Sequence, residues 1–174
     1  MNPKYSIRVA TSEDVPLVLR FVKELADYEK LPHEVTATEE LLRQNLFGDR
    51  RSAEVLLALE GETYVGFAVF FHNFSTFLGK PGIYLEDVYV RLAFRGRGYG
   101  KALMIYVARI AKERDCGRFE YSVLDWNTPS LDFYRSLGAV SMNEWTVQRM
   151  TSDAIIRLAG QQLPGEGKIL LPLK

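Results

Sequence analysis

The feature that most restricts the fold is a basic, glycine-rich turn between an apolar strand and an amphipathic helix. Ile83–Val90 (IYLEDVYV) is typical of a strand, the turn RLAFRGRGYGK follows, and apolar residues recur at helical spacing over Lys101–Arg114. Amide groups at a helix start lack partners within the helix and attract anions, and glycine lets the backbone approach them closely. The segment therefore predicts a phosphate-binding site.

Two familiar nucleotide loops do not fit this turn. A P-loop ends in Gly-Lys-Ser/Thr, whereas Gly100-Lys101 is followed by Ala102, and Arg95 stands where the first glycine belongs. In a dinucleotide fingerprint the third glycine would come one residue later than it does here. A solvated basic loop remains the alternative, but the order of strand, turn and helix favours the anion site.

The remaining segments predict an α/β (α+β) domain with a mixed sheet, antiparallel first and parallel later, flanked by helices. Glu60-Gly61-Glu62 predicts a hairpin, and Thr36 with Glu39 has capping-box spacing. Further expected strands are 5–10, 53–59, 63–71, 118–124 and 140–150; further expected helices end near 28 and span 37–47 and 128–137; 75–82 is expected to be a loop. We expect one domain over 1–160 and a tail, 161–174, that docks as an edge strand or packs on a partner subunit.

Composition excludes several classes of protein. The formal net charge of the 174 residues is zero, which gives a nucleic-acid partner no global electrostatic support. The longest apolar runs are too short to span a membrane, and the N-terminus lacks the apolar region of a signal peptide. With one cysteine, Cys116, and two histidines, we expect no disulfide, no metal site and a cytoplasmic location.

The turn and its neighbours resemble a known family. Arg95–Gly100 (RGRGYG) is similar to the R/Q-x-x-G-x-G/A signature of the GNAT superfamily of N-acetyltransferases, and the order of elements agrees. Tyr84–Asp87 (YLED), Asp125–Ser130 (DWNTPS) and Lys23–Glu29 (KELADYE) resemble the diamine (spermidine/spermine, thialysine) acetyltransferase subfamily. The resemblance covers residues 5–150 and implies the GNAT fold, with a mixed, mostly antiparallel sheet of six to seven strands.

The resemblance implies acetyl-CoA as the cofactor, coenzyme A as the product and no metal. The turn amides would hold the pyrophosphate, the backbone of Val88–Val90 would bind the pantetheine arm and supply the oxyanion donor, and Asn127 and Ser130 would form hydrogen bonds with the cofactor. The cofactor-binding residues implied are Val88, Tyr89, Val90, Arg95, Gly96, Arg97, Gly98, Tyr99, Gly100, Lys101, Asn127, Ser130 and Tyr134.

Acetyl transfer to an amine also needs a base, because an alkyl amine is protonated at neutral pH. The resemblance makes Glu86 that base, directly or through water, and makes Tyr134 the general acid for the thiolate. By strand alternation, Glu86 and Asp87 should face opposite sides, with Asp87 beside Leu85 and Tyr89. Either acid could instead be an ion-pair partner, and Tyr134 could be a core aromatic residue.

The resemblance places a cationic substrate among acidic and aromatic residues. These substrate-binding residues are Tyr28, Glu29, Glu86, Asp87 and Glu144, although Glu29 and Glu144 could also be ordinary surface acids. Pro32 and His33 stand where spermidine enzymes are more acidic, so a shorter diamine or a thialysine-like amine remains open.

Three functions follow from these residues. The first is an acetyl-CoA-dependent amine N-acetyltransferase that acts by direct attack in a ternary complex, with a homodimer expected from the resemblance. The second is an acetyltransferase acting on protein lysines or N-termini. The third is a non-catalytic acyl-CoA sensor, which would have no need of both Glu86 and Tyr134.

Overall fold

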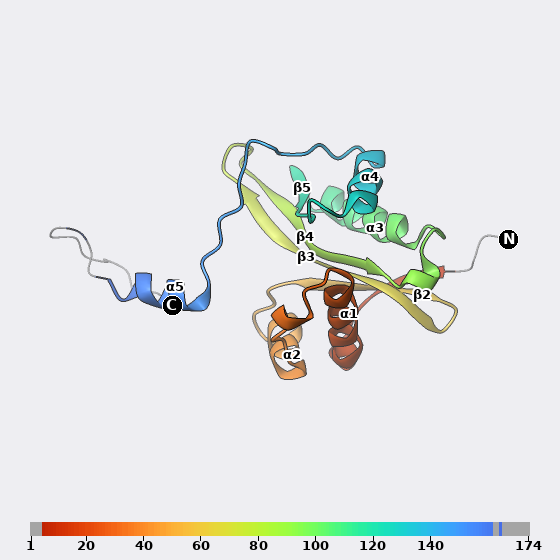
Figure 1. Ribbon diagram of the computed structural model, residues 1–174. Helices are drawn as coiled ribbons and strands as arrows, with labels where there is room; N and C mark the ends of the chain where they lie inside the picture. The colour runs from red at the N-terminus through yellow and green to blue at the C-terminus, as the bar shows by residue number, and fades with distance from the viewer. Residues whose placement is uncertain (1–4, 162–163, 165–174) are drawn as a thin grey trace. The chain divides into compact units, whose positions relative to one another are not determined.

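A computed structural model describes residues 5–161 and residue 164 and divides the chain into two compact units, Met1–Leu124 and Asp125–Lys174 (Figure 1). The first unit contains β1 (Tyr5–Val9), η1 (Ser12–Asp14), α1 (Val15–Tyr28), η2 (Pro32–Glu34), α2 (Glu39–Phe47), β2 (Glu54–Glu60), β3 (Thr63–Ser75), β4 (Lys80–Val90), η3 (Leu92–Phe94), α3 (Tyr99–Glu113) and β5 (Arg118–Tyr121). The second contains α4 (Thr128–Ser136) and α5 (Ser152–Ala159). The expected single domain over 1–160 stays a prediction.

The first unit is a five-stranded sheet in the order β1-β2-β3-β4-β5, with helices on both faces. The first four strands pair antiparallel, and β5 joins β4 in parallel, so the predicted change of direction along the sheet is confirmed. Figure 1 shows α1 and α2 against one face and α3 against the other. The predicted mixed α/β class is confirmed, but the sheet of the described residues has fewer strands than expected.

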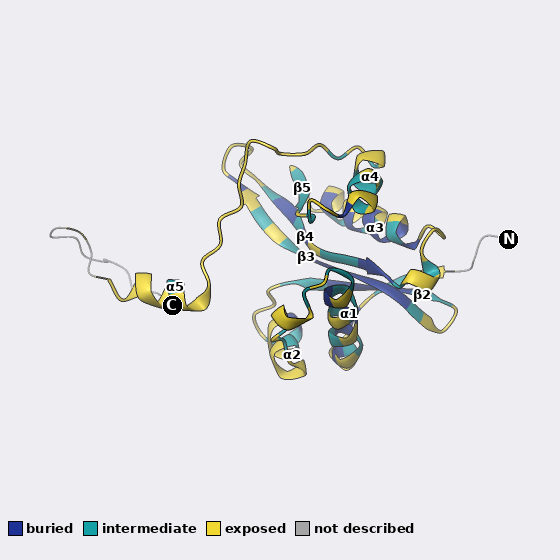
Figure 2. Ribbon diagram, in the orientation of Figure 1, coloured by how far each residue is buried: buried dark blue, intermediate teal, exposed yellow. Residues whose placement is uncertain are grey.

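The core on the α1 face of the sheet is largely aromatic and aliphatic. The rings of Phe21 on α1 and Phe67 on β3 stack with their centroids 5.2 Å apart. Val18, Leu57 and Val69 pack into the same cluster. Figure 2 shows that the buried positions concentrate along the central strands and the inner faces of α1 and α3. Burial of this apolar surface fixes α1 against the sheet on the face that carries Asp87, beside the predicted catalytic acid Glu86.

Strand β4 contains a bulge at the predicted catalytic acid. Its pairing with β3 runs Asp87 to Val69 and Leu85 to Phe70, so Glu86 is an extra residue without a partner position. Residues directly opposite in a ladder share a face, which places Asp87 on the α1 face with Val69. Leu85 lies opposite Phe70 on the other face, so the prediction that Leu85 and Asp87 share a face is wrong, because strict alternation ignores a bulge.

Glycine positions explain why the predicted loop 75–82 is too long. Strand β3 continues to Ser75 and β4 begins at Lys80, which leaves a short turn in which Gly79 has a φ of +62°. Gly82 lies within β4, and a side chain there would collide with Asn73 and Arg118. Gly82 therefore permits close packing inside the sheet, although the glycine- and proline-containing composition of residues 75–82 is typical of a turn.

Three other local predictions need correction. The cap of α2 is Thr38, whose Oγ1 accepts a hydrogen bond from the Leu41 amide, and Thr36 does not fill that position. Residues 140–150 form no strand, because none of the described strands pairs with them, and Val140 and Val147 are exposed. Helix α5 was not predicted, although Gly160 at its C-terminal cap was an available signal. The predicted docking of the tail 161–174 lies almost wholly outside the described residues.

Candidate active site

The glycine-rich turn has the backbone geometry of an anion site. Gly96 and Gly98 have φ angles of +76° and +91°, which side-chain-bearing residues rarely adopt. Gly98 caps α3, and its carbonyl accepts the amide of Ala102 at 2.9 Å. The amides of Tyr99, Gly100 and Lys101 therefore lie in the first helical turn, where no intrahelical acceptor exists, and point toward a site for negative charge.

Side chains of the turn also have partners within the first unit. Glu60, at the end of β2, accepts hydrogen bonds from the Tyr99 hydroxyl at 2.7 Å and from Arg97 Nη1 at 3.2 Å. The Tyr99 ring is almost fully buried, and its burial together with Glu60 raises the pKa of its phenol. Tyr99 can therefore contribute only its backbone amide to a cofactor, while Glu60 fastens the turn to the sheet.

Arg95, the first residue of the signature, points back toward β4 and α1. Its Nε donates to the Val90 carbonyl at 2.8 Å, and its Cζ lies 4.2 Å from the centroid of the Tyr28 ring. The Tyr89 ring is the second aromatic neighbour, at 5.6 Å. The predicted cofactor residues Tyr89, Val90 and Arg95 and the predicted substrate residue Tyr28 are thus brought together.

The edge of β4 next to β5 is open beyond the bulge. Pairing between the two strands ends at Leu85 and Tyr121, where β5 itself ends. The backbone of Val88 and neighbouring residues therefore has β3 on one side and no described strand on the other. An extended amide-containing chain, such as pantetheine, can form hydrogen bonds with such an edge. This edge is where the cofactor arm and the oxyanion donor were predicted, and these roles stay predictions.

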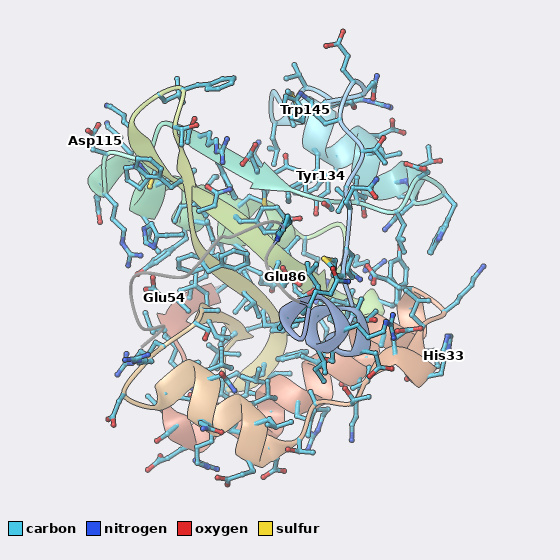
Figure 3. All side chains as sticks on the ribbon, turned by 90° about the vertical axis from the view of Figure 1, so that its left-hand side faces the viewer. His33, Glu54, Glu86, Asp115, Tyr134 and Trp145 are labelled. Carbon is cyan, nitrogen blue, oxygen red and sulfur yellow. The ribbon has the colours of Figure 1, made fainter. Side chains whose placement is uncertain are left out.

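Three predicted carboxylates gather near the bulge, and we call Glu29, Glu86 and Asp87 the acidic cluster. Glu86 is exposed on β4 and is labelled in Figure 3, whereas Asp87 is half-buried on the α1 face. Burial, with the negative charges of Glu86 and Glu29, raises the pKa of Asp87 to about 7. Burial also raises the pKa of Glu29 above its ordinary value. The cluster can attract a cation, and Asp87 can take up a proton near neutral pH.

The described residues include no group of three or more histidine, cysteine, aspartate or glutamate side chains arranged to hold a metal ion. Within the same part of the chain, no helix is long and apolar enough to cross a membrane.

The second unit carries the remaining predicted residues. Asn127 is buried and caps α4, where its Oδ1 faces the Ser130 amide at 3.4 Å. The Tyr134 ring packs beside Phe133 with centroids 5.4 Å apart, which is also the packing that a core aromatic residue would show. Glu144 is exposed. The roles of these residues stay predictions.

Sequence reasoning overlooked two residues of this region. Arg91, which follows β4, forms a bidentate ion pair with Glu24 of α1, with N–O distances of 2.7 and 2.9 Å. Both residues lie in segments quoted from the sequence, 91–101 and 23–29, but no pattern in these segments indicates that the two residues pair, because they are 67 positions apart. A further signal is that Glu24 is a charged residue within the largely apolar helix α1.

Comparison with known proteins gives a consistent result. Residues 19–139, more than half of the chain, match the model of the acetyltransferase (GNAT) family. A thialysine N-epsilon-acetyltransferase of Sus scrofa is 38% identical over 166 residues, covering 89% of this chain and 97% of that protein. L-ornithine N5-acetyltransferase NATA1 of Arabidopsis thaliana is 30% identical, covering 86% of this chain and 85% of that protein.

Among solved structures, an integron cassette protein from the mobile metagenome of V. cholerae superposes with a TM-score of 0.76. It is 25% identical and covers 92% of this chain and 99% of that one.

Proposed function

Because the chain belongs to the GNAT acetyltransferase family and is an amine N-acetyltransferase, we propose that it acetylates a small cationic amine from acetyl-CoA by direct attack in a ternary complex. The observation that carries the substrate class is the acidic cluster on β4 and α1. Acetyl-CoA supplies the activated acetyl group when it is bound. The first-turn amides of α3 fit its pyrophosphate, and the open edge of β4 fits its pantetheine arm.

Asp87 is the proposed proton acceptor of this reaction. An amine arriving as an ammonium ion must lose a proton before it attacks, and a carboxylate with a pKa about 7 is better matched to that task than an ordinary one. Glu86, the acceptor expected from the family, is exposed beside it and adds negative charge that keeps the Asp87 pKa high. We therefore assign Glu86 to ammonium binding or a water-mediated step, and we keep Tyr134 as the proposed acid for the thiolate.

The names of the relatives narrow the proposed substrate. Thialysine and ornithine each carry an aliphatic side-chain amine on an amino acid, and enzymes named for them match this chain over most of its length. Because the negative charge of Glu29 contributes to the raised pKa of Asp87, both carboxylates can attract one cationic substrate. We propose a thialysine-, lysine- or ornithine-like amine, with diamines and polyamines as the next class.

A substrate panel tests this proposal. Release of coenzyme A thiol is followed with thialysine, ornithine, lysine, putrescine, spermidine and a lysine-containing peptide. Small amines should react best, and Glu29→Gln should raise their KM by about tenfold, while Glu62→Gln in the exposed β2–β3 turn should leave it unchanged. Reaction with the peptide alone would favour a protein acetyltransferase. Acetyl-CoA binding without transfer to any amine would favour a sensor.

We also propose a homodimer in the cytoplasm. Large apolar side chains are exposed at the turn between β3 and β4, where Phe77 is 94% exposed, and again at Trp145 in the second unit. A second copy of the chain would remove such surface from water. A monomer in light scattering at micromolar concentration would contradict the dimer.

A further inference from the structure

Two arginines of the segment between β4 and α3 contact one face of α1. Arg91 forms its ion pair with Glu24, and Arg95 stacks on Tyr28. The two arginines are four positions apart, and so are Glu24 and Tyr28, which places the latter pair on the same face of the helix. We call these four side chains, Arg91, Arg95, Glu24 and Tyr28, the arginine clasp.

The contacts of Arg91 show that its side chain packs at the edge of the hydrophobic core. Its Cζ lies 4.8 Å from the centroid of the Phe21 ring, and its Nη1 donates to the Tyr64 carbonyl at 2.9 Å. About a quarter of each partner's side chain is accessible, 27% for Arg91 and 28% for Glu24. A pair with this geometry and shielding holds its two elements more firmly than an exposed ion pair does.

Arg95 completes the connection on the side of the acidic cluster. Its guanidinium contacts both the Tyr28 ring of α1 and the Tyr89 ring of β4, and its Nε donates to the Val90 carbonyl. Tyr28 directly precedes Glu29, whose charge acts on Asp87. The Arg95 side chain thus connects the glycine-rich turn to α1, on the side of the amine substrate. It points away from the amides proposed to bind phosphate.

We propose that Arg91 and Arg95 are positioning residues that hold the C-terminal half of α1 against β4, so that Glu29 and Asp87 stay on one side of the sheet for amine binding. This inference rests on the proposed amine acetyltransferase function and adds to it two residues of the acceptor side. It gives Arg95 a role distinct from that of a phosphate ligand. A phosphate ligand would affect the affinity for acetyl-CoA, whereas the clasp, which needs the planar guanidinium and its Nε–H, would affect the affinity for the amine.

Arg95→Lys keeps the positive charge but removes the planar guanidinium and its Nε–H, and the two roles are separated by which ligand then binds more weakly. The amine KM should rise about three- to tenfold, while the Kd of acetyl-CoA measured by calorimetry stays within about twofold. An unchanged amine KM overturns the proposal. A rise in the acetyl-CoA Kd as large as that in the amine KM also overturns it, since Arg95 would then act on the donor.

The contribution of the Arg91–Glu24 ion pair to the clasp is tested by exchanging the charges of its two residues. Glu24→Arg and Arg91→Glu should each raise the amine KM severalfold, and the two together should restore part of the loss. Arg114→Gln is the matched control, because Arg114 forms a similar bidentate pair with Glu54, labelled in Figure 3, away from α1. If the exchanged pair recovers nothing, or if the control raises the KM equally, the pair has no specific positioning role.

Hydrogen exchange supplies a readout that does not depend on activity. In Arg91→Gln and Arg95→Lys, amides of residues 24–31 should exchange faster than in the wild type, while those of α3 should not change. Unaltered exchange over 24–31 overturns the clasp. If the wild-type protein acetylates no amine at all, the proposed function fails, and the exchange result still decides whether the clasp holds α1.

Discussion

Replacing Asp87 by asparagine should stabilise the protein above neutral pH and inactivate it. The ordinary pKa of this carboxyl is 3.8, and burial with the charges of Glu86 and Glu29 raises it to about 7 in the folded chain. A shift of about three units corresponds to about 4 kcal/mol between the two protonation states. The folded state therefore binds the proton of Asp87 more tightly than the unfolded state does.

The sign of the pH dependence follows from that difference. Below pH 4 both states are protonated and Asp87 has no net effect, whereas between about pH 4 and 7 its contribution to the free energy of unfolding decreases by about 1.4 kcal/mol per pH unit. Above pH 7 the loss is complete. Asp87→Asn removes the titrating group, so its advantage over the wild type should grow through this window to about 4 kcal/mol, or on the order of 10 °C in Tm.

Urea unfolding of both proteins at pH 4.5, 6, 7 and 8 measures this difference. Taking the difference between the two proteins cancels the titration of the groups that do not interact with Asp87. In parallel, kcat/KM of the wild type should fall about tenfold per pH unit below 7, and Asp87→Asn should lower it by about 10²- to 10⁴-fold at pH 8. A stability difference that does not vary with pH would refute the raised pKa, and an active Asp87→Asn variant would refute the role as base.

Three further changes test neighbouring parts of the site. Glu86→Gln should lower the Asp87 pKa by removing a negative charge, so the acidic limb of the pH–rate profile should move to lower pH; a limb that stays in place would show that Glu86 does not act on the proton acceptor. Tyr134→Phe should lower kcat by about 10²-fold with acetyl-CoA binding kept, and an unchanged kcat would remove Tyr134 from the mechanism. Gly98→Ala should weaken acetyl-CoA binding and lower Tm by a few degrees, because φ is +91° there although the space is open; wild-type values for both would show that the turn does not need this conformation.

The parts of the fold that local patterns determine were predictable from the sequence. Helical spacing and a glycine at its start placed α3 within two residues, and Gly61 marked the hairpin between β2 and β3. The bulge at Glu86 was not predictable, because its position depends on which residues of β3 and β4 pair. The bulge places Leu85 and Asp87 on opposite faces of the sheet. Asp87 thereby lies on the α1 face, which is one reason why we propose Asp87 and not Glu86 as the proton acceptor.

The site residues divide in the same way. The turn Arg95–Gly100 and the acids Glu29 and Asp87 could be selected from motifs. The partners of Arg95 could not, since contacts between α1 and the segment after β4 arise only when both pack on the sheet. The raised Asp87 pKa likewise needs the burial and the neighbouring charges that folding produces.

Direct transfer to an amine is tested most directly by mass spectrometry in two steps. The protein is first incubated with acetyl-CoA alone, and its intact mass is measured; thialysine, ornithine or putrescine is then added, and the small-molecule product is identified. Direct attack predicts an unmodified protein in the first step and one acetylamine for each coenzyme A released in the second. A stoichiometric acetyl-protein before amine addition, or release of coenzyme A without any acetylamine, would contradict it.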